Sequence, residues 1–529
     1  MKILITDKIL EIGVVLLQKE HEVHTMYNLD KEELIKVIPS YDAILVRSGT
    51  RVTKDVIEAG INLKVIGRAG VGVDNIDVKA ATDKGIIVVN SPNGNTIATT
   101  EYTMAMLLSL SRNLPQAYNS MKLGKWNRSE FLGVELQGKT LGVIGFGRIG
   151  SEVAKRAAGF NMKVLAYDPF ISEESAEDAG VDLVDLERIY ADADFITIHT
   201  PLTAETRYMV NQEAFAKMKP GVRIIQCARG GIVDEDALID ALDKGIVAGA
   251  AIDVFENEPL NQNHKLLEFE NVIVTPHLGA STQEAQKMVA ISVAEGILSA
   301  LRGDPVTSAA NMPPVPPRVI QLIKPYLHLA EKMGTLAINL SEGRLDTLEI
   351  CYTGEIGEVD SKILTYAIIK GILNPILQEA VNYVNAYSVA KLRGIKIREV
   401  KSKDGENFAN LISVKVRTDK GEHRVAGTLF GRQEGRIVMI DGYRVDVEPK
   451  GWLLIIPHSD SPGMVGKVGS LLGENSINIT GMQVGRTEQE GTNIMVVSVQ
   501  QEIPAPVLSN LKQAEGILGA KLIYFNGTN

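Results

Sequence analysis

The segment Thr140–Asp168 constrains the fold more than any other part of the chain. It begins with a short apolar run, Thr140–Ile144, followed by three glycines in G-x-G-x-x-G spacing. The next stretch, Arg148–Phe160, has apolar residues at helical spacing, and Lys163–Tyr167 predicts a second strand that ends at an aspartate. A strand, a glycine turn, a helix and a second strand in this order are typical of a parallel sheet covered by helices.

The glycine spacing has a physical explanation in a dinucleotide-binding turn. Gly145 permits the tight turn, Gly147 lets backbone amides approach a pyrophosphate, and Gly150 lets the helix pack close to the strand. The helix N-terminus favours the phosphate charge. Asp168 can accept hydrogen bonds from a ribose hydroxyl and would repel a 2′-phosphate, so the sequence predicts NAD rather than NADP. A glycine turn in another kind of parallel α/β protein is the alternative.

Length, charge and cysteine content exclude several classes of protein. A chain of 529 residues predicts three to four domains, each of about 100–200 residues. The net charge of −10 and the absence of a basic block argue against nucleic acid or an anionic membrane as partner. The sequence has no apolar stretch of about 20 residues to span a bilayer, and its first residues predict a strand, not a signal peptide. Cys227 and Cys351 lack metal-ligand spacing, so we expect no metal and a reducing compartment, the cytoplasm.

Polar clusters follow the predicted strands of the N-terminal region, where apolar runs alternate with helical patterns. Arg47 and Ser48 come after one strand, Gly70 lies in the glycine-rich stretch after the next, and Asn95 follows a later one. Parallel sheets bind ligands beyond the carboxyl ends of their strands, so these groups can form an anion site. Ordinary loop chemistry is the alternative.

Three further residues also come directly after predicted strands, in the region that follows the glycine turn. These are Arg229, Glu258 and His277. A lone histidine is usually structural, but an arginine, a glutamate and a histidine on the same rim as a dinucleotide point to catalysis. Cys227 lies near this rim, and we expect it to be a small, partly buried residue without chemistry of its own.

Long helical patterns and a proline-rich segment indicate the domain organisation. Ile97–Leu114 predicts a helix between two domains, and Gln283–Leu301 predicts a helix that returns to the first. The four prolines of Met312–Pro317 favour an extended linker. The predicted division is 1–96 with 287–311 for a first domain, 97–286 for an inserted nucleotide-binding domain, 312–317 for the linker, 318–450 for an α+β domain and 451–529 for a terminal domain.

The terminal domain has the element order βαββαβ, which is typical of a ferredoxin-like fold. The stretch from His458 to Gly463 precedes its first helix, and Asn478 begins its next strand. A helix N-terminus can hold a carboxylate while Asp460 holds an ammonium, so these groups can bind a small zwitterion. The alternative is that Asp460 or Ser461 only caps the helix. The 318–450 domain contains no catalytic constellation; its Asp441-Gly442 pair predicts a type I′ hairpin.

Five short motifs together resemble the D-2-hydroxyacid dehydrogenase family over the part of the chain before the linker. They are Gly145–Gly150, His199–Pro201, Ala228–Gly231, Asp253–Phe255 with Glu258-Pro259, and Pro276–Ser281. Over its full length the chain is similar to the long-form D-3-phosphoglycerate dehydrogenases, which carry an intervening domain and a C-terminal ACT domain that binds amino acids. The resemblance implies a Rossmann-like, doubly wound parallel sheet inserted in a flavodoxin-like substrate domain, followed by an α+β domain and a ferredoxin-like ACT domain.

The resemblance also implies an activity and a set of contacts. The expected reaction is NAD-dependent oxidation of 3-phospho-D-glycerate to 3-phosphohydroxypyruvate, the first step of L-serine biosynthesis, in a homo-oligomer (a tetramer) that L-serine inhibits. His277 would be the base, Glu258 its partner and Arg229 the carboxylate-binding group. The NAD contacts carried over are Arg148, Ile149, Asp168, Thr200, Cys227, Ala228, Arg229, Asp253, His277, Gly279 and Ala280. The substrate contacts are Arg47, Ser48, Gly70, Asn95 and Arg128, and the effector contacts are His458, Asp460 and Asn478. A glyoxylate or hydroxypyruvate reductase and a non-catalytic NAD sensor are the alternatives.

Overall fold

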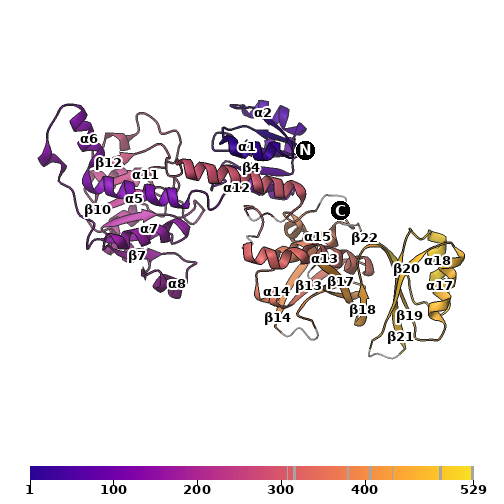
Figure 1. Ribbon diagram of the computed structural model, residues 1–529. Coiled ribbons are helices and arrows are strands. Elements are labelled where there is room, and N and C mark those ends of the chain that lie inside the picture. Colours follow the sequence, from indigo (N-terminus) through magenta and orange to yellow (C-terminus); the bar gives the residue numbers. More distant parts are fainter. Residues whose placement is uncertain are drawn as a thin grey trace.

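The computed structural model describes residues 1–304, 306, 308–313, 317–377, 381–403, 408–431, 433–487 and 491–525. Four sheets follow one another along the chain, and Figure 1 shows each in a lobe of its own. Prolines 314 and 316 of the predicted linker lie outside the described residues. Among the described helices, none has the length and apolarity that crossing a membrane requires.

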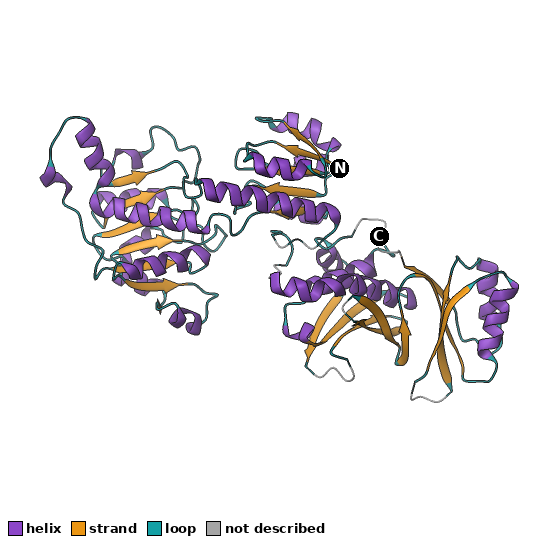
Figure 2. Ribbon diagram, viewed as in Figure 1, coloured by secondary structure: helices purple, strands orange, loops and turns teal. Residues whose placement is uncertain are grey.

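The first sheet is parallel, with strand order β2-β1-β3-β4-β5. Its strands are β1 (Lys2–Ile5), β2 (Glu22–Thr25), β3 (Ala43–Val46), β4 (Val65–Arg68) and β5 (Ile87–Val89), and its helices are α1 (Glu11–Gln18), α2 (Lys31–Val37), α3 (Lys54–Ala59) and α4 (Val78–Asp83), with a 3-10 turn at Ile38–Ser40. Helices cover both faces (Figure 2). Strand β2 was not predicted, because it lies at the sheet edge and its polar, partly exposed residues give no apolar run.

The helix α12 (Gln283–Arg302) returns to this first sheet, as predicted. Val293 and Ile297 of α12 are fully buried against the sheet, in one cluster with Ile3. The approach is close, since a Cβ at Gly67 of β4 would lie 2.5 Å from Ile297 Cδ1. Two segments far apart in the sequence therefore build one core, and α12 connects it to the second sheet (Figure 1).

The second sheet is also parallel, in the order β12-β11-β10-β9-β6-β7-β8. Its strands are β6 (Thr140–Ile144), β7 (Lys163–Tyr167), β8 (Asp182–Leu183), β9 (Phe195–Ile198), β10 (Val222–Gln226), β11 (Val247–Ile252) and β12 (Val272–Val274). Its helices are α5 (Thr96–Arg112), α6 (Leu114–Lys122), α7 (Arg148–Gly159), α8 (Glu173–Asp178), α9 (Leu186–Asp192), α10 (Gln212–Lys217) and α11 (Glu235–Asp243), with 3-10 turns at Arg128–Phe131 and Lys265–Glu268. The strand order reverses at β6, so the glycine turn that follows β6 lies at the switch point where such sheets bind ligands. The predicted Rossmann-like fold is confirmed.

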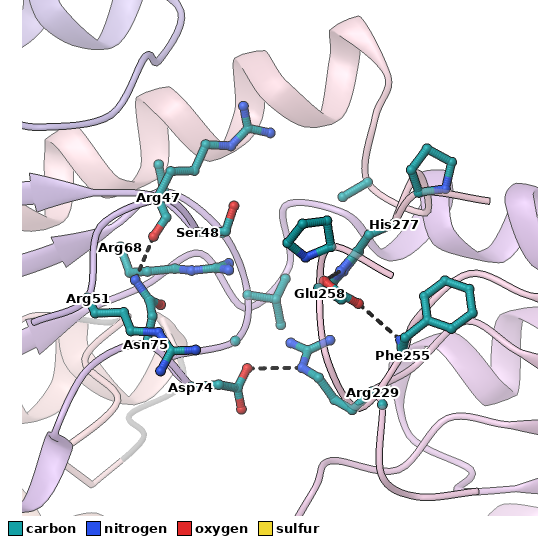
Figure 3. A pocket seen from close by; sticks show the side chains of 18 of the residues that line it. Arg47, Ser48, Arg51, Arg68, Asp74, Asn75, Arg229, Phe255, Glu258 and His277 are labelled. Carbon is teal, nitrogen blue, oxygen red and sulfur yellow. Dashed lines mark hydrogen bonds and ion pairs between the residues drawn. The ribbon is translucent and has the colours of Figure 1, made fainter. Parts of the chain in front are cut away.

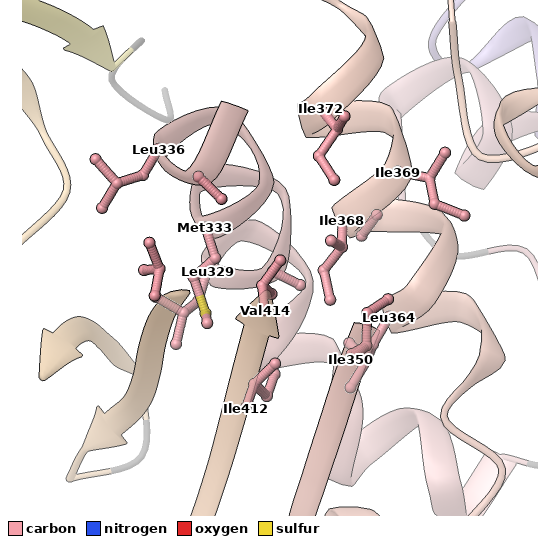
Figure 4. Packing of buried hydrophobic residues seen from close by; sticks show 14 of the residues in the cluster. Leu329, Met333, Leu336, Ile350, Leu364, Ile368, Ile369, Ile372, Ile412 and Val414 are labelled. Carbon is pink, nitrogen blue, oxygen red and sulfur yellow. The ribbon is translucent and has the colours of Figure 1, made fainter. Parts of the chain in front are cut away.

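The third sheet is mixed, in the order β14-β13-β15-β16-β17-β18, and two long helices cover one face. The elements are α13 (Pro317–Leu340), β13 (Leu345–Gly354), α14 (Glu355–Glu358), α15 (Lys362–Leu373), α16 (Ala386–Leu392), β14 (Lys396–Ser402), β15 (Asn410–Thr418), β16 (Gly421–Phe430), β17 (Glu434–Ile440) and β18 (Tyr443–Val447). Met333 of α13 and Ile368 of α15 pack over the sheet (Figure 4). Asp441 and Gly442 both have positive φ (49° and 87°), which confirms the predicted type I′ hairpin.

The terminal sheet is antiparallel, in the order β20-β21-β19-β22, and confirms the βαββαβ prediction. Its elements are β19 (Gly451–Ser459), α17 (Met464–Glu474), β20 (Ile479–Gly485), β21 (Thr492–Val499), α18 (Ala505–Gln513) and β22 (Lys521–Phe525). The N-cap of α17 is Gly463 at φ 90°, so the capping alternative for Asp460 and Ser461 is wrong. The Asp460 carboxylate instead accepts a hydrogen bond from Asn493 Nδ2 at 2.8 Å.

Candidate active site

A cavity of about 1170 Å³ lies between the first and second sheets, at the carboxyl ends of strands from both (Figure 3). One wall comes from the loops after β3 and β4, and the other from the loops after β10, β11 and β12. Eight of the residues predicted from the sequence line this one cavity: Arg47, Ser48, Gly70, Asn95, Arg229, Glu258, His277 and Ala280.

His277 and Glu258 form a hydrogen-bonded pair on one wall of the cavity. His277 Nδ1 is 2.8 Å from Glu258 Oε2, so Nε2 is the ring nitrogen left to reach a substrate. Glu258 Oε1 also accepts a hydrogen bond from the Phe255 amide at 3.1 Å. Partial burial raises the pKa of Glu258, but the hydrogen bond and the charge of His277 outweigh it and hold that pKa below its usual range. Glu258 is therefore ionised at neutral pH and can stabilise a His277 imidazolium.

Asp253 holds the loop that carries His277. Its carboxylate is fully buried and accepts hydrogen bonds from the Thr275 hydroxyl at 2.7 Å and from the amides of Leu278 and Gly279 at 2.8 and 2.9 Å. The His277 amide donates to the Asp253 carbonyl at 2.9 Å. Burial raises the pKa of the Asp253 carboxyl, against the effect of these donors. Asp253 thus fixes the backbone on which His277 adopts its positive φ of 55°.

Arg229 reaches across the cleft to the opposite wall. Its Nε donates to Asp74 Oδ2 at 3.1 Å, and its Nη1 donates to the Ala228 carbonyl at 2.7 Å. Gln226 Nε2 donates to the Arg229 carbonyl at 3.0 Å, which holds the backbone at this point. The ion pair links the two domains. Asp74 was not predicted, because it lies in a loop without periodic pattern.

The loop that carries Arg47 and Ser48 is held at both ends. The Asp7 carboxylate accepts hydrogen bonds from the amides of Arg47 and Thr50 at 2.5 and 3.1 Å. Asn75 Nδ2 donates to the carbonyls of the same two residues, both at 2.6 Å. Neither Asp7 nor Asn75 was predicted, since both contribute through contacts with residues distant in the sequence.

The glycine turn fits a dinucleotide. A Cβ at Gly150 would lie 2.0 Å from the Gly145 carbonyl oxygen, so only glycine allows this packing. A Cβ at Gly147 would meet nothing within 4 Å, which leaves the N-terminus of α7 open to a pyrophosphate. Both Asp168 oxygens accept backbone hydrogen bonds, from the Phe146 and Phe170 amides at 2.9 Å, at the carboxyl end of β7. The fixed Asp168 carboxylate therefore lies where the ribose of a bound dinucleotide would approach the carboxyl end of β7.

The other predicted cofactor contacts surround the same turn. Arg148 Nη1 donates to the Pro92 carbonyl at 2.8 Å and so links the turn to a loop of the first domain. Thr200 follows His199, whose ring is buried; this burial lowers the pKa of His199 to about 3, so it is neutral. Cys227 is buried, and burial raises the pKa of its thiol, so it is no nucleophile. Contacts of Ile149 and the remaining residues with NAD stay predictions.

Within one chain, Arg128 does not lie with the other predicted substrate residues. It begins the exposed 3-10 turn Arg128–Phe131, in the arm that follows α6. It does not line the cavity described above. Its predicted contact with substrate stays a prediction.

The predicted effector residues lie at opposite ends of the terminal sheet. Ser459, next to Asp460, pairs with Thr492, whereas Ile479, next to Asn478, pairs with Val499. Seven residues of β21 separate these positions, about 24 Å at the rise of an antiparallel strand. His458 is buried, with Nδ1 2.8 Å from the Ser459 carbonyl oxygen. One chain does not bring Asp460 and Asn478 together.

Family models match three parts of the chain. Residues 104–279 match the NAD-binding domain of D-isomer specific 2-hydroxyacid dehydrogenases. Residues 322–441 match the D-3-phosphoglycerate dehydrogenase intervening domain, and residues 453–516 match the ACT domain.

Relatives match nearly the whole chain. A D-3-phosphoglycerate dehydrogenase of Synechocystis is 48% identical over 520 residues, 98% of this chain and 94% of the relative. The chain belongs to the D-3-phosphoglycerate dehydrogenase family. Another relative of that name, from Bacillus subtilis, is 47% identical over 484 residues, 92% of each chain. A member of this family is an NAD-dependent oxidoreductase, which confirms the predicted enzyme class and cofactor.

Solved structures match more than half of the chain. D-lactate dehydrogenase of Aquifex aeolicus, complexed with NAD and lactic acid, aligns with a TM-score of 0.53 and 32% identity. The alignment covers 57% of this chain and 96% of the lactate dehydrogenase chain. A glyoxylate reductase of Paecilomyes thermophila aligns with a TM-score of 0.55 and 29% identity, over 59% of this chain and 98% of its own. Such reductases therefore share the fold but not the full length, which favours the family assignment over the reductase alternative.

Proposed function

We propose that the chain oxidises the C2 hydroxyl of 3-phospho-D-glycerate with NAD, giving 3-phosphohydroxypyruvate and NADH and starting L-serine biosynthesis. The observation that carries the proposal is the His277–Glu258 pair, which faces Arg229 in the cavity between the two domains. The full-length relatives of the same family support the choice of substrate.

The residues have separate roles in this reaction. The planar guanidinium of Arg229 suits the two oxygens of a carboxylate, which would replace Asp74 as its partner. His277 Nε2 takes the hydroxyl proton, and the ionised Glu258 stabilises the imidazolium that results. NAD, when bound at the glycine turn, supplies the hydride acceptor. The protein thus provides orientation and charge on both walls of the cavity.

The test is NADH formation from 3-phospho-D-glycerate at alkaline pH, where proton release favours oxidation. We expect turnover with this substrate and much slower turnover with D-lactate. Turnover with D-lactate or glycolate alone would support the reductase alternative. NADH binding without turnover of any 2-hydroxy acid would support the sensor alternative.

We further propose that L-serine binds the ACT domains and inhibits. Because Asp460 and Asn478 lie at opposite ends of one sheet, a complete site takes one residue from each of two chains. Calorimetry should show serine binding to the wild type and none to Asp460→Asn or Asn478→Ala alone. After subunit exchange, a mixture of these two variants should regain part of the binding, because some chain pairs then contain one intact site. If the mixture binds no serine, the proposal of a site shared by two chains is wrong.

The exposed arm that follows α6 supports a homo-oligomer, which we propose to be a tetramer. Leu123, Trp126 and Leu132 are 73%, 80% and 90% exposed, and three such apolar side chains on one arm suit contact with a second copy. Arg128 lies on the same arm and would then reach the partner's cavity. Light scattering should give the mass of a tetramer, and Trp126→Glu should lower it. A monomeric wild type would refute the proposal.

We also propose the domain division predicted from the sequence, with one refinement. The three family matches fall inside 97–286, 318–450 and 451–529. The boundary between 286 and 287 falls within α12, which therefore belongs to both domains. Both cysteines are free thiols, which suits the reducing cytoplasm. Limited proteolysis should cut first near 312–317 and leave the dehydrogenase part intact.

A further inference from the structure

The loop that carries Glu258, residues 256–264, has little packing of its own. Within this loop Leu260 and His264 are partly buried, and the other residues are exposed. Glu258 lies near its start, with its side chain against His277 (Figure 3). A loop that buries so little apolar surface depends on polar contacts to keep one conformation.

One carboxylate, that of Glu235, binds both ends of this loop. Glu235 Oε1 accepts a hydrogen bond from the Glu256 amide at 2.7 Å, and Glu235 Oε2 lies 3.1 Å from His264 Nε2. The Glu235 side chain is only 15% exposed, so water competes little for these contacts and each of them is strengthened. Both oxygens of Glu235 are thus used to hold the loop.

The ring of His264 is oriented for this contact. Its Nδ1 accepts a hydrogen bond from the Leu266 amide at 3.4 Å, at the N-cap of the 3-10 turn Lys265–Glu268. Because an amide can only donate, Nδ1 carries no proton, and Nε2 carries the proton that faces Glu235. Leu266 is buried in the core of the second sheet, which fixes this end of the loop.

Glu235 itself is held by a rigid element, because it is the first residue of helix α11. Leu238 and Leu242 of this helix are buried in the same core as Leu266. Burial, and with it the negative charge of Glu256, raises the pKa of the Glu235 carboxyl, although the Glu256 amide and His264 act in the opposite direction. The loop is therefore tied to the core of the second sheet through one buried acid.

We propose that Glu235 and His264 are positioning residues, which hold Glu258 where it can bind His277. This rests on the proposed function, in which Glu258 and His277 are the catalytic pair. Glu235 does not line the active-site cavity, so it acts through the loop and not on the substrate. A displacement of Glu258 by about 1 Å would weaken its 2.8 Å hydrogen bond to His277, and misplacement on this scale can cost about 10²-fold in rate.

The experiment is a double-mutant cycle on the full chain, measured as kcat for oxidation of 3-phospho-D-glycerate. Glu235→Ala should lower kcat about 10- to 10²-fold at unchanged NADH affinity. In the Glu258→Ala background, where no carboxylate remains to be positioned, the same change should cost less than about threefold. A variant that only destabilised the fold would lower kcat by the same factor in both backgrounds.

Two further variants complete the design. In His264→Asn the new side chain can still accept from the Leu266 amide but is too short to reach Glu235, so kcat should fall about three- to tenfold. An unchanged kcat would remove His264 from the proposal. Asp240→Asn is the matched control, because Asp240 lies on the same helix and binds Lys244 instead; its effect should stay within about threefold.

Hydrogen exchange separates this proposal from the proposed function. Peptides that cover residues 255–264 should exchange at least about fivefold faster in Glu235→Ala than in the wild type, and at the wild-type rate in Asp240→Asn, because only the first variant frees the Glu256 amide. Unchanged exchange, or equal losses of kcat with and without Glu258, would overturn the positioning role. A wild type that oxidises no 2-hydroxy acid, although it binds NADH, would overturn the proposed function, and the exchange rates would still decide whether Glu235 holds the loop.

Discussion

Glu258→Gln tests the catalytic pair most directly. The substitution keeps the size of the side chain and removes its charge. In the structure that charge lies 2.8 Å, oxygen to nitrogen, from His277 Nδ1, and it favours the protonated ring. We therefore expect the variant to bind NADH normally and to lose both the orientation of His277 and the stabilisation of its imidazolium.

The magnitude follows from the distance and the exposure of the pair. Two unit charges about 4 Å apart attract by ~1 kcal/mol in water and ~4 kcal/mol at an effective dielectric constant of ~20. The side chains of His277 and Glu258 are 46% and 38% exposed, so solvent screens them and the low end applies, about 1–2 kcal/mol. A loss of about 1.4 kcal/mol in the stabilisation of the developing imidazolium predicts about a tenfold loss of rate. Misorientation of the ring adds about another tenfold.

The assay is kcat/KM for oxidation of 3-phospho-D-glycerate between pH 6 and 10. Glu258→Gln should lower kcat/KM about 10²-fold across this range, because the imidazolium that forms during proton transfer loses its counter-charge and the ring loses its orientation. Glu256→Gln is the control, because Glu256 lines the same cavity and binds Tyr208 instead. A loss of less than about threefold, or an equal loss in Glu256→Gln, would refute the reasoning.

Three further outcomes are expected. His277→Ala should lower kcat at least about 10²-fold at unchanged NADH affinity, as measured by fluorescence titration; near-wild-type turnover would remove His277 from the mechanism. Arg229→Lys should raise KM and lower kcat, because an ammonium replaces a two-pronged donor. Asp194→Asn should lower Tm at pH 7 by the loss of about 1–2 kcal/mol, since Lys219 and the Thr140 amide bind this carboxylate at 2.8 and 2.9 Å. Burial raises the pKa of Asp194, but these donors lower it below 3.8, so its stabilisation is complete above that pH and disappears as the pH falls through the lowered value. A Tm difference that does not shrink as the pH falls below 3.8 would contradict this.

The order of elements could be predicted because its signals are local. The strands at Thr140–Ile144 and Lys163–Tyr167 begin and end where predicted, since each is a short apolar run bounded by turn residues. The same holds for Thr492–Val499 in the terminal sheet. The edge strand β2 was missed for the same reason, because its partly exposed residues carry no such run.

The candidate site was predictable as a set of residues and not as a geometry. Arg229, Glu258 and His277 follow strand ends, and the rule for parallel sheets places such residues on one rim. Their hydrogen-bond partners could not be predicted from the sequence. Asp74, for example, binds Arg229 from a loop 155 positions earlier in the chain. Arg68 stands in a cluster visible in the sequence, but nothing local shows that its Nε is buried without a hydrogen-bond partner among the described residues.

The sequence by itself therefore determined the fold class and the cofactor and predicted the candidate catalytic groups, because motif spacing and hydrophobic period are properties of neighbouring residues. Only the tertiary structure decided which charges meet. It placed Asp74 against Arg229, and among the described residues it left the buried Arg68 Nε without a hydrogen-bond partner. It also separated Asp460 from Asn478 along one sheet. Such contacts depend on how the fold brings distant loops together. The free energies of charge pairing and burial therefore arise only in the folded chain.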